Sequence, residues 1–356
     1  MTCIYVGEHP LQLIAKWLER SASLPLTIRF NDYSGQIHEV SPEVINILNK
    51  HSARWYDMHL DIPAYHLQYL CGSPQANMLH RLALCHYTLP SIRSTFSMKS
   101  KPRPTDLKLM AVGLPYVDII WDNLTIASVH IIGADECVEL IRRAPLLQTL
   151  RLRSTNSSSG IFPLPDTRIV HPHLRSLELS RINIRGALAG IFDAVCFPSL
   201  EQWIYGDCSL LRENMISFIG SSPYLKIFKM NLDDTLRHQI IKFLRPLSTL
   251  EFLELNSVLT HYRIIQFIDT LCAPSQSPLF LPKLQSLTFI CESSFPWESL
   301  PQIFASSRWR SLKVTVNTPS AGHGIVYETA KQLRELVDKG FDLSIGEIDA
   351  LWEYEE

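Results

Sequence analysis

The sequence predicts an α/β solenoid, in which strand–helix repeats stack to share one continuous core. Two observations predict this fold class. A short apolar frame, φxxφxφ with φ an apolar residue, recurs at nearly constant spacing along the chain. A proline also stands two residues before the first apolar position in most of the central copies. Proline suits that place because it ends a helix and can enter a strand before any ladder N–H is needed.

The frame is clearest in the centre of the chain, where copies start at Leu147, Leu174, Leu200, Leu225 and Leu250, 25 to 27 residues apart. Because 46% of the residues are hydrophobic, one window fits by chance about one time in ten. The regular recurrence therefore carries the argument. Periods of this length are typical of leucine-rich repeats. Other copies start at Trp55, Leu79, Leu284 and Trp309, and looser ones at Pro104 and Trp121.

The segments between these strands have helical spacing of apolar residues at 136–144, 215–220, 240–244 and 264–271. In the strand LEFLEL, alternation points Leu253 and Leu255 into the core, and Phe252 and Glu254 to the opposite face. The asparagine that regular repeats place after the strand is mostly absent. The predicted fold is therefore an irregular leucine-rich-repeat solenoid, with a curved parallel sheet on its concave side and helices on its convex side.

We expect a single domain with capped ends, since a terminal repeat would otherwise expose its core to water. Residues 1–22 form an N-terminal capping helix segment, and residues 23–327 form the solenoid. Residues 328–356 supply a closing helix, a last strand FDLSI and an acidic tail. Polar loops are expected at 99–106 and 154–160.

Composition excludes several classes of protein. The 33 basic and 35 acidic residues give a net charge of −2, without the basic excess of a nucleic-acid binder. The sequence shows no signal-peptide pattern, which would indicate secretion. It also contains no run of about 18 apolar residues, which would indicate a membrane span. The eight cysteines are scattered, with no CxxC pair, and are expected to be reduced thiols of a cytoplasmic or nuclear protein.

Catalytic and metal-binding patterns are weak. Cys71, His80, Cys85 and His86 lie near one another, and residues 171–173 form an HxH, but neither group has the paired spacing of a zinc site. The motifs GxGxxG, GxSxG and HExxH and the phosphate-binding Gly-rich loop are absent, and only 14 of 356 residues are Gly. We therefore expect no metal, no cofactor and no enzymatic activity. An enzyme whose site has no sequence motif is the alternative.

The concave face is the candidate site. Aligned frames bring a mixed-charge set of side chains together there, which suits a protein-binding surface. The alternative interpretation is a ladder of ordinary ion pairs, with Arg151 beside Glu178 and Lys229 beside Glu254. Trp55, Trp203 and Trp309 are expected in the core. The predicted face comprises Arg151, Arg153, Glu178, Ile204, Lys229, Asn231, Phe252, Glu254, Asn256, Thr288 and Lys313.

Three phrases, WLERSASLPLTIRF, IIWDNLTIASVHI and ELIRRAPLLQTLRL, resemble the leucine-rich-repeat regions of fungal F-box-like proteins of the mushroom type. The resemblance runs from about Trp17 to Ile345. It implies a repeat surface that holds a substrate, and an F-box that docks on the adaptor subunit of a cullin-based ubiquitin ligase. Nothing before Trp17 resembles the F-box, so we expect either a truncated form or gene model, or a relative that has lost the docking module.

The expected function is that of a non-enzymatic scaffold, similar to the substrate-recognition region of an F-box subunit. An orphan interaction or inhibitor module without a link to ubiquitination is the alternative. The expected partner is a protein, joined by the cullin adaptor if an F-box is encoded upstream. We expect no nucleic acid, no membrane and a monomeric chain.

Overall fold

A computed structural model of the chain describes residues 2–6, 9–31, 42–85, 94–155, 159–180, 187–208, 213–232, 240–257, 261–273, 280–291, 295–305, 309, 311–317 and 325–345. The fold is α/β, with a large parallel sheet of 14 strands in this part of the chain. The predicted single array falls into two compact units. Unit 1 comprises Met1–Leu174 and Gly186–Val195, and unit 2 comprises Arg175–Arg185 and Cys196–Glu356.

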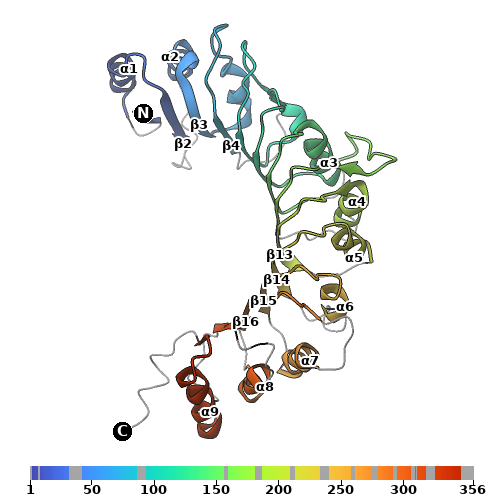
Figure 1. Cartoon of the computed structure of the whole chain (residues 1–356). Coiled ribbons are helices and arrows are strands. Elements are labelled where there is room, and N and C mark those ends of the chain that lie inside the picture. Colours follow the sequence, from blue (N-terminus) through green and yellow to red (C-terminus); the bar gives the residue numbers. More distant parts are fainter. Residues whose placement is uncertain are drawn as a thin grey trace. The chain divides into compact units, whose positions relative to one another are not determined.

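Unit 1 holds the first strands of the sheet, which pair in chain order: β1 (Thr2–Val6), β2 (Leu26–Asn31), β3 (Trp55–Asp61), β4 (Arg81–Cys85), β6 (Asp106–Met110), β8 (Ile126–His130) and β9 (Thr149–Arg153). Its helices are α1 (Leu11–Arg20), α2 (Pro42–Lys50), α3 (Ala134–Arg143) and α4 (Ala187–Ala194). Helices α1 and α2 lie on one side of β2 and β3 (Figure 1).

Short elements complete unit 1. Strands β5 (Phe96–Ser97) and β7 (Val117–Asp118) pair with each other outside the large sheet. Segments of 3-10 helix are η1 (Ser52–Arg54), η2 (Ala64–Tyr69) and η3 (Leu114–Tyr116). The two-residue strand β10 (Ile169–Val170) also belongs to unit 1, whereas β12 (Val195–Cys196) has one residue in each unit.

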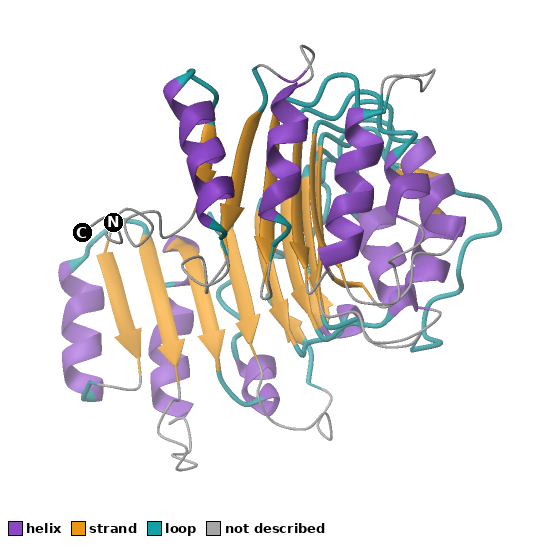
Figure 2. Ribbon diagram, turned by 90° about the horizontal axis from the view of Figure 1, so that it is seen from below, coloured by secondary structure: helices purple, strands orange, loops and turns teal. Residues whose placement is uncertain are grey.

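Unit 2 continues the same alternation of strand and helix. Its sheet strands are β11 (Ser176–Ser180), β13 (Gln202–Cys208), β14 (Ile227–Leu232), β15 (Phe252–Ser257), β16 (Ser286–Cys291), β17 (Lys313–Asn317) and β18 (Leu343–Ile345). Its helices are α5 (Glu213–Gly220), α6 (Ile240–Leu244), α7 (His261–Cys272), α8 (Leu300–Ala305) and α9 (Tyr327–Asp338), with the 3-10 turn η5 (Trp297–Ser299). Helices α5 to α8 lie on one side of strands β13 to β16 (Figure 1), and the arrows of neighbouring strands point the same way (Figure 2).

The predicted helices are confirmed. Segments 215–220, 240–244 and 264–271 fall in α5, α6 and α7, and segment 136–144 overlaps α3 up to its end at Arg143. At the front of the chain the predicted helix is α1, and at the end it is α9. The last strand, predicted as FDLSI, is β18.

The prolines before the strands have a defined role. In a repeated turn, the first apolar residue of the frame donates its N–H to the carbonyl three residues earlier: Leu147 to Ala144, Leu200 to Phe197, Leu225 to Ser222 and Leu284 to Leu281. The proline occupies the second position of each of these turns, where its fixed φ is favourable. The sequence signal therefore marks a β-turn that leads from each helix into the next strand.

The N-terminal segment contains more than the expected capping helix. Strand β1 precedes α1 and pairs with β2 in a parallel ladder from Thr2–Leu26 to Val6–Phe30. Ile4 and Val6 are buried, at 0% and 3% exposure, while Cys3 and Tyr5 face solvent. This alternation of apolar and exposed residues is the reason that residues 2–6 form a sheet strand.

The core consists of the inward frame positions and the buried helix faces. In unit 2, aromatic rings gather around Trp203, which lies 5.4 Å from Phe228, 5.4 Å from Phe218 and 6.1 Å from Phe243 between ring centroids. These rings come from strands β13 and β14 and helices α5 and α6. Trp55, Trp203 and Trp309 are all buried, as predicted. The helices thereby cover one face of the strands, and the other face of the strands carries the candidate site.

Candidate functional site

The side chains that point away from the helices form what we call the strand face. Across unit 2, the predicted order of the central row is confirmed over five strands, β11, β13, β14, β15 and β16. Glu178 pairs in register with Ile204, Ile204 with Lys229, and Lys229 with Glu254. Glu254 in turn pairs with Thr288. All these residues are partly exposed except Thr288, which is buried at 8% exposure.

Lys313 does not belong to this row, and its predicted place is wrong by two residues. In β17 the residue beside Thr288 is Thr315, whereas Lys313 pairs with Ser286. Trp309 therefore does not occupy the first position of the last frame. It is a buried residue whose indole N–H donates to the Leu271 carbonyl at 3.3 Å. Lys313 remains on the strand face, because a shift of two residues keeps a side chain on the same side of a strand.

Two further rows flank the central row in unit 2. One row runs Gln202, Ile227, Phe252, Ser286 and Lys313 through successive registers. In the other row, Asn231 pairs with Asn256, Asn256 with Ile290, and Ile290 with Asn317. The predicted outward positions of Ile204 and Phe252 are confirmed, since both side chains are partly exposed.

Lys229 contacts two neighbouring side chains of this face. Its Nζ donates to Glu254 Oε2 at 2.9 Å and lies 5.3 Å from the centre of the Phe252 ring. The expected Lys229–Glu254 ion pair is thus present, with side-chain exposures of 35% and 20%. Exposed pairs contribute about 0–1 kcal/mol, and a cation over an aromatic ring about 0.5–1 kcal/mol. The Lys229–Glu254 pair therefore fixes the positions of these side chains but contributes little to the free energy of folding.

Arg151 and Arg153 lie on β9 in unit 1. Arg151 pairs with Ser128, and Arg153 with His130, of the neighbouring strand β8. Both arginines are exposed, and each has polar interactions of its own. Glu178, the predicted neighbour of Arg151, belongs to unit 2.

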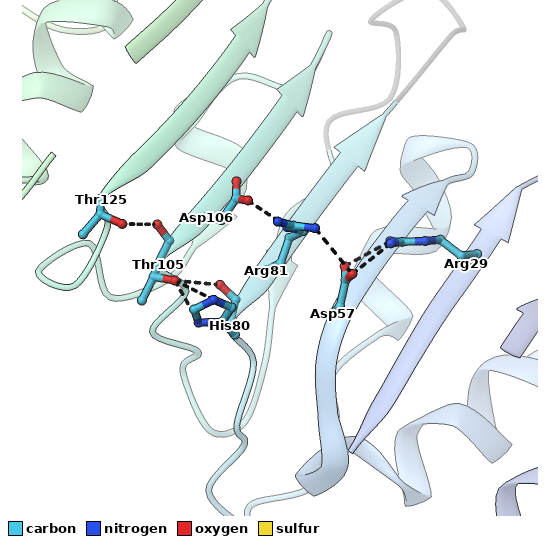
Figure 3. A network of polar contacts seen from close by, with 7 residues as sticks. All are labelled: Arg29, Asp57, His80, Arg81, Thr105, Asp106 and Thr125. Carbon is cyan, nitrogen blue, oxygen red and sulfur yellow. Dashed lines mark hydrogen bonds and ion pairs between the residues drawn. The ribbon is translucent and has the colours of Figure 1, made fainter. Parts of the chain in front are cut away.

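Unit 1 carries a charged ladder that sequence reasoning missed (Figure 3). Arg29 on β2 binds the Asp57 carboxylate on β3 through two hydrogen bonds of 3.0 and 2.8 Å. Arg81 on β4 lies 3.9 Å from the same carboxylate and donates to Asp106 on β6 at 2.7 Å. The signs therefore alternate over four neighbouring strands. Asp57, Arg81 and Asp106 each occupy the third position of their frame, and this is the signal that could have revealed the ladder.

A second chain of polar contacts runs beside the charged ladder, where the strands begin (Figure 3). The Thr105 hydroxyl lies 2.9 Å from His80 Nδ1, and the Thr125 hydroxyl donates to the Thr105 carbonyl at 3.0 Å. The His80 ring also stacks on Tyr56, with centroids 5.2 Å apart and an interplanar angle of 13°. These contacts hold the exposed His80 imidazole in one orientation.

The groups that most resemble catalytic residues are His59 and Cys85. Cys85 Sγ lies 3.6 Å from His59 Nε2, across strands β3 and β4. Burial raises the pKa of the Cys85 thiol, and burial followed by the charges of Arg29 and Lys108 lowers the pKa of His59. Both shifts favour a neutral thiol beside a neutral imidazole. A nucleophilic cysteine needs the opposite, an accessible thiolate with a lowered pKa.

The histidine and cysteine groups considered as metal sites are dispersed. His80 faces solvent, Cys85 is buried against His59, and His86 lies outside the described residues. His171 is buried and donates from Nε2 to the Ala144 carbonyl at 2.9 Å, while His173 is exposed. Within the described ranges, no three His, Cys, Asp or Glu side chains gather as they would around a metal ion.

Comparison with known proteins leaves the family open. No protein-family model and no curated protein matches the chain. Among the helices that the structure describes, none combines the length and apolarity needed to cross a membrane. The geometry of the strand face is therefore the basis for the functional proposal.

Proposed function

We propose that this chain is a non-enzymatic protein-binding scaffold made of irregular leucine-rich repeats, and that its strand face holds a partner protein. One observation carries the proposal: partly exposed apolar residues stand among charged ones in registered rows on this face. Ile204, Ile227 and Phe252 are half-buried beside the Lys229–Glu254 pair. Protein interfaces combine such apolar anchors with a polar surround.

The leucine-rich-repeat assignment has its own support. The second apolar position of the frame forms one unbroken buried row of neighbours in unit 2, comprising Leu177, Trp203, Phe228, Leu253 and Leu287. The spacing of 25 to 27 residues over the central copies and the turn before each strand fit the same repeat.

The backbone makes this face suitable for recognition. In parallel ladders, neighbouring strands lie about 4.8 Å apart, so side chains of one row stand at fixed intervals. A partner that binds them meets groups that are already ordered, and little conformational entropy is lost. Such rows favour binding over catalysis, because side chains aligned along a sheet do not converge on one reacting atom.

The ubiquitin-ligase setting is a narrower proposal. It rests on the resemblance of three sequence phrases to fungal F-box-like proteins. In that setting the chain is the substrate-recognition region, and its place is the cytoplasm or the nucleus. An orphan interaction module has the same strand face and lacks the cullin adaptor among its partners.

The test is affinity capture from the cells that make the protein, with three forms of the chain. The first is the wild type, and the second carries Ile204→Glu and Phe252→Glu on the strand face. The third is a matched control with Tyr327→Glu and Val337→Glu, exposed positions of 69% and 45% on α9. A captured protein is then purified, and its direct binding to the three forms is measured.

We expect a protein that the wild type and the α9 control bind alike, and that the strand-face variant binds at least about tenfold more weakly. Equal binding by all three folded forms would overturn the proposal. Cullin and its adaptor among the captured proteins would support the ubiquitin-ligase setting, and a partner without them would favour the orphan module.

A further inference from the structure

A pocket of about 660 Å³ opens in unit 1 where strands β3, β4 and β6 begin. Its wall includes Tyr56 from the start of β3, His80 just before β4, and Arg103 from the segment that leads into β6. The segment is part of the polar stretch at 99–106, which was predicted only as a loop. The pocket lies beside the polar chain of His80, Thr105 and Thr125 and is separate from the predicted face residues.

The lining of this pocket is electrostatically one-sided. It contains Lys101, Arg103 and His80, and no Asp or Glu. Lys101 has a partner outside the lining, because its Nζ lies 2.7 Å from Asp118 Oδ1. Arg103 is exposed and forms no ion pair with any residue that the structure describes. The pocket therefore offers an exposed guanidinium without an ion-pair partner among the described residues, and this group has the donor geometry to bind a carboxylate through two hydrogen bonds.

The lining also includes aromatic and apolar side chains. Tyr56 and His80 stack with ring centroids 5.2 Å apart, and Thr105 fixes the His80 ring by a contact of 2.9 Å. Met78 is 46% exposed and Ile120 is half-buried in the same lining. An aromatic or aliphatic side chain can pack against these groups in the same pocket that the cationic side chains line.

We infer that this pocket binds an acidic peptide segment, in which a carboxylate lies next to an aromatic or aliphatic residue. The carboxylate pairs with Arg103, and the apolar neighbour packs against Tyr56, His80 and Met78. The inference goes beyond the strand face, since none of these residues belongs to the rows described for unit 2.

The openness and the lining of the pocket favour an acidic peptide over a small molecule or a nucleic acid as its ligand. It is open and mixes polar with apolar groups, whereas small-molecule sites enclose most of their ligand. A nucleic acid would need a longer basic track, and the whole chain has a net charge of −2. An extended acidic peptide requires only a short cationic stretch with an apolar neighbour.

The experiment selects binders for the full chain from a library of random twelve-residue peptides displayed on phage. Selection runs in parallel on the wild type, on Arg103→Glu, and on Lys99→Glu as the matched control. Lys99 is exposed, lies in the same segment and does not line the pocket. Circular dichroism first confirms that the variants are folded, and selected peptides are then measured by fluorescence anisotropy.

We expect enriched peptides to combine Asp or Glu with a neighbouring aromatic or aliphatic residue. Arg103→Glu should weaken their binding by about tenfold or more, and Lys99→Glu much less. Raising the salt from about 50 to about 300 mM should weaken the wild-type complex. Loss of the aromatic wall in Tyr56→Ala should weaken binding without removing the salt dependence.

Three outcomes would overturn the inference. They are the absence of any enriched peptide, enrichment without acidic residues, and equal binding by Arg103→Glu. A labelled single-stranded oligonucleotide that binds through Arg103 while acidic peptides fail would assign the pocket to nucleic acid instead. Because the strand-face test uses other residues, failure of one proposal leaves the other standing.

Discussion

Arg29 on β2 and Asp57 on β3 form a bidentate pair, in which Nη1 donates to Oδ1 at 3.0 Å and Nη2 donates to Oδ2 at 2.8 Å. The Asp57 side chain is only 8% exposed, and Arg81 approaches its carboxylate from the other side at 3.9 Å. Paired hydrogen bonds in a partly buried place are stronger than a single exposed ion pair. This contact is the best-ordered part of the charged ladder.

We predict that Asp57→Ala lowers the free energy of unfolding by about 1–3 kcal/mol, because Arg29 loses both hydrogen bonds. Asp106→Ala should cost about 0–1 kcal/mol, since its partner Arg81 is 53% exposed. Urea unfolding followed by circular dichroism measures both values. Equal losses for the two variants would contradict the ranking.

The register of β15 leads to a second prediction. Leu253 is fully buried between Phe228 and Leu287, so Leu253→Asp places an unpaired charge in the core. We expect a loss of about 4 kcal/mol or more, or failure to fold. The double variant Lys229→Ala with Glu254→Ala should stay within about 1 kcal/mol of the wild type. A thermally stable Leu253→Asp protein would show that the frame is misassigned.

Asp135 anchors the segment that follows β9. Its buried carboxylate accepts hydrogen bonds from the N–H groups of Ser159, Ile161 and Phe162 at 2.6, 3.1 and 3.1 Å, and from the Ser159 hydroxyl at 2.7 Å. Asp135→Ala removes all four acceptor contacts. We expect faster hydrogen exchange of these three amides and a loss of about 1–3 kcal/mol.

Asp166→Ala is the control for Asp135, because Asp166 is an exposed carboxylate farther along the same segment. It should leave the exchange of the three amides unchanged. If Asp135→Ala also leaves their exchange unchanged, the carboxylate does not anchor the segment.

His171 predicts a dependence of stability on pH. Burial is the main cause that lowers its pKa, so the unfolded chain binds this proton more readily than the folded chain does. The contribution of His171 is complete above the unfolded pKa of about 6.5 and is lost as pH falls below it. His51 and His59 also have pKa values lowered first by burial, and they act in the same direction.

We therefore expect the free energy of unfolding to fall between about pH 7.5 and 5.5, and His171→Gln to make this slope shallower. Urea titrations at a series of pH values provide the measurement. A steeper slope in His171→Gln would reverse the assigned sign.

Most strands could be placed from the apolar frame, and two copies could not. The loose copy at Trp121 starts three residues early, because the register pairs Leu107 with Ala127 and Leu109 with Val129, which puts the frame start at Leu124. The copy at Trp309 starts two residues early. In a chain this rich in apolar residues, several starts satisfy the frame, and only the ladder of backbone hydrogen bonds selects one.

The candidate face was predictable in part for the same reason. Side-chain alternation along a strand is local, so the outward positions of Ile204, Phe252 and Glu254 follow from sequence. The Arg29–Asp57–Arg81–Asp106 ladder needs the additional knowledge that β2, β3, β4 and β6 are neighbours. That adjacency depends on the looser repeats near the N-terminus, where the frame alone is ambiguous.

The sequence by itself determined the repeat, the buried positions within each strand and the helices between strands, since these follow from local periodicity and turn chemistry. Only the tertiary structure decided the strand register at the two ambiguous copies, the addition of β1 and the pocket at Arg103. The physical reason is the distance along the chain over which each kind of interaction acts. Periodicity acts within one segment, whereas Tyr56, His80 and Arg103 come together only because three separate strands stack in order.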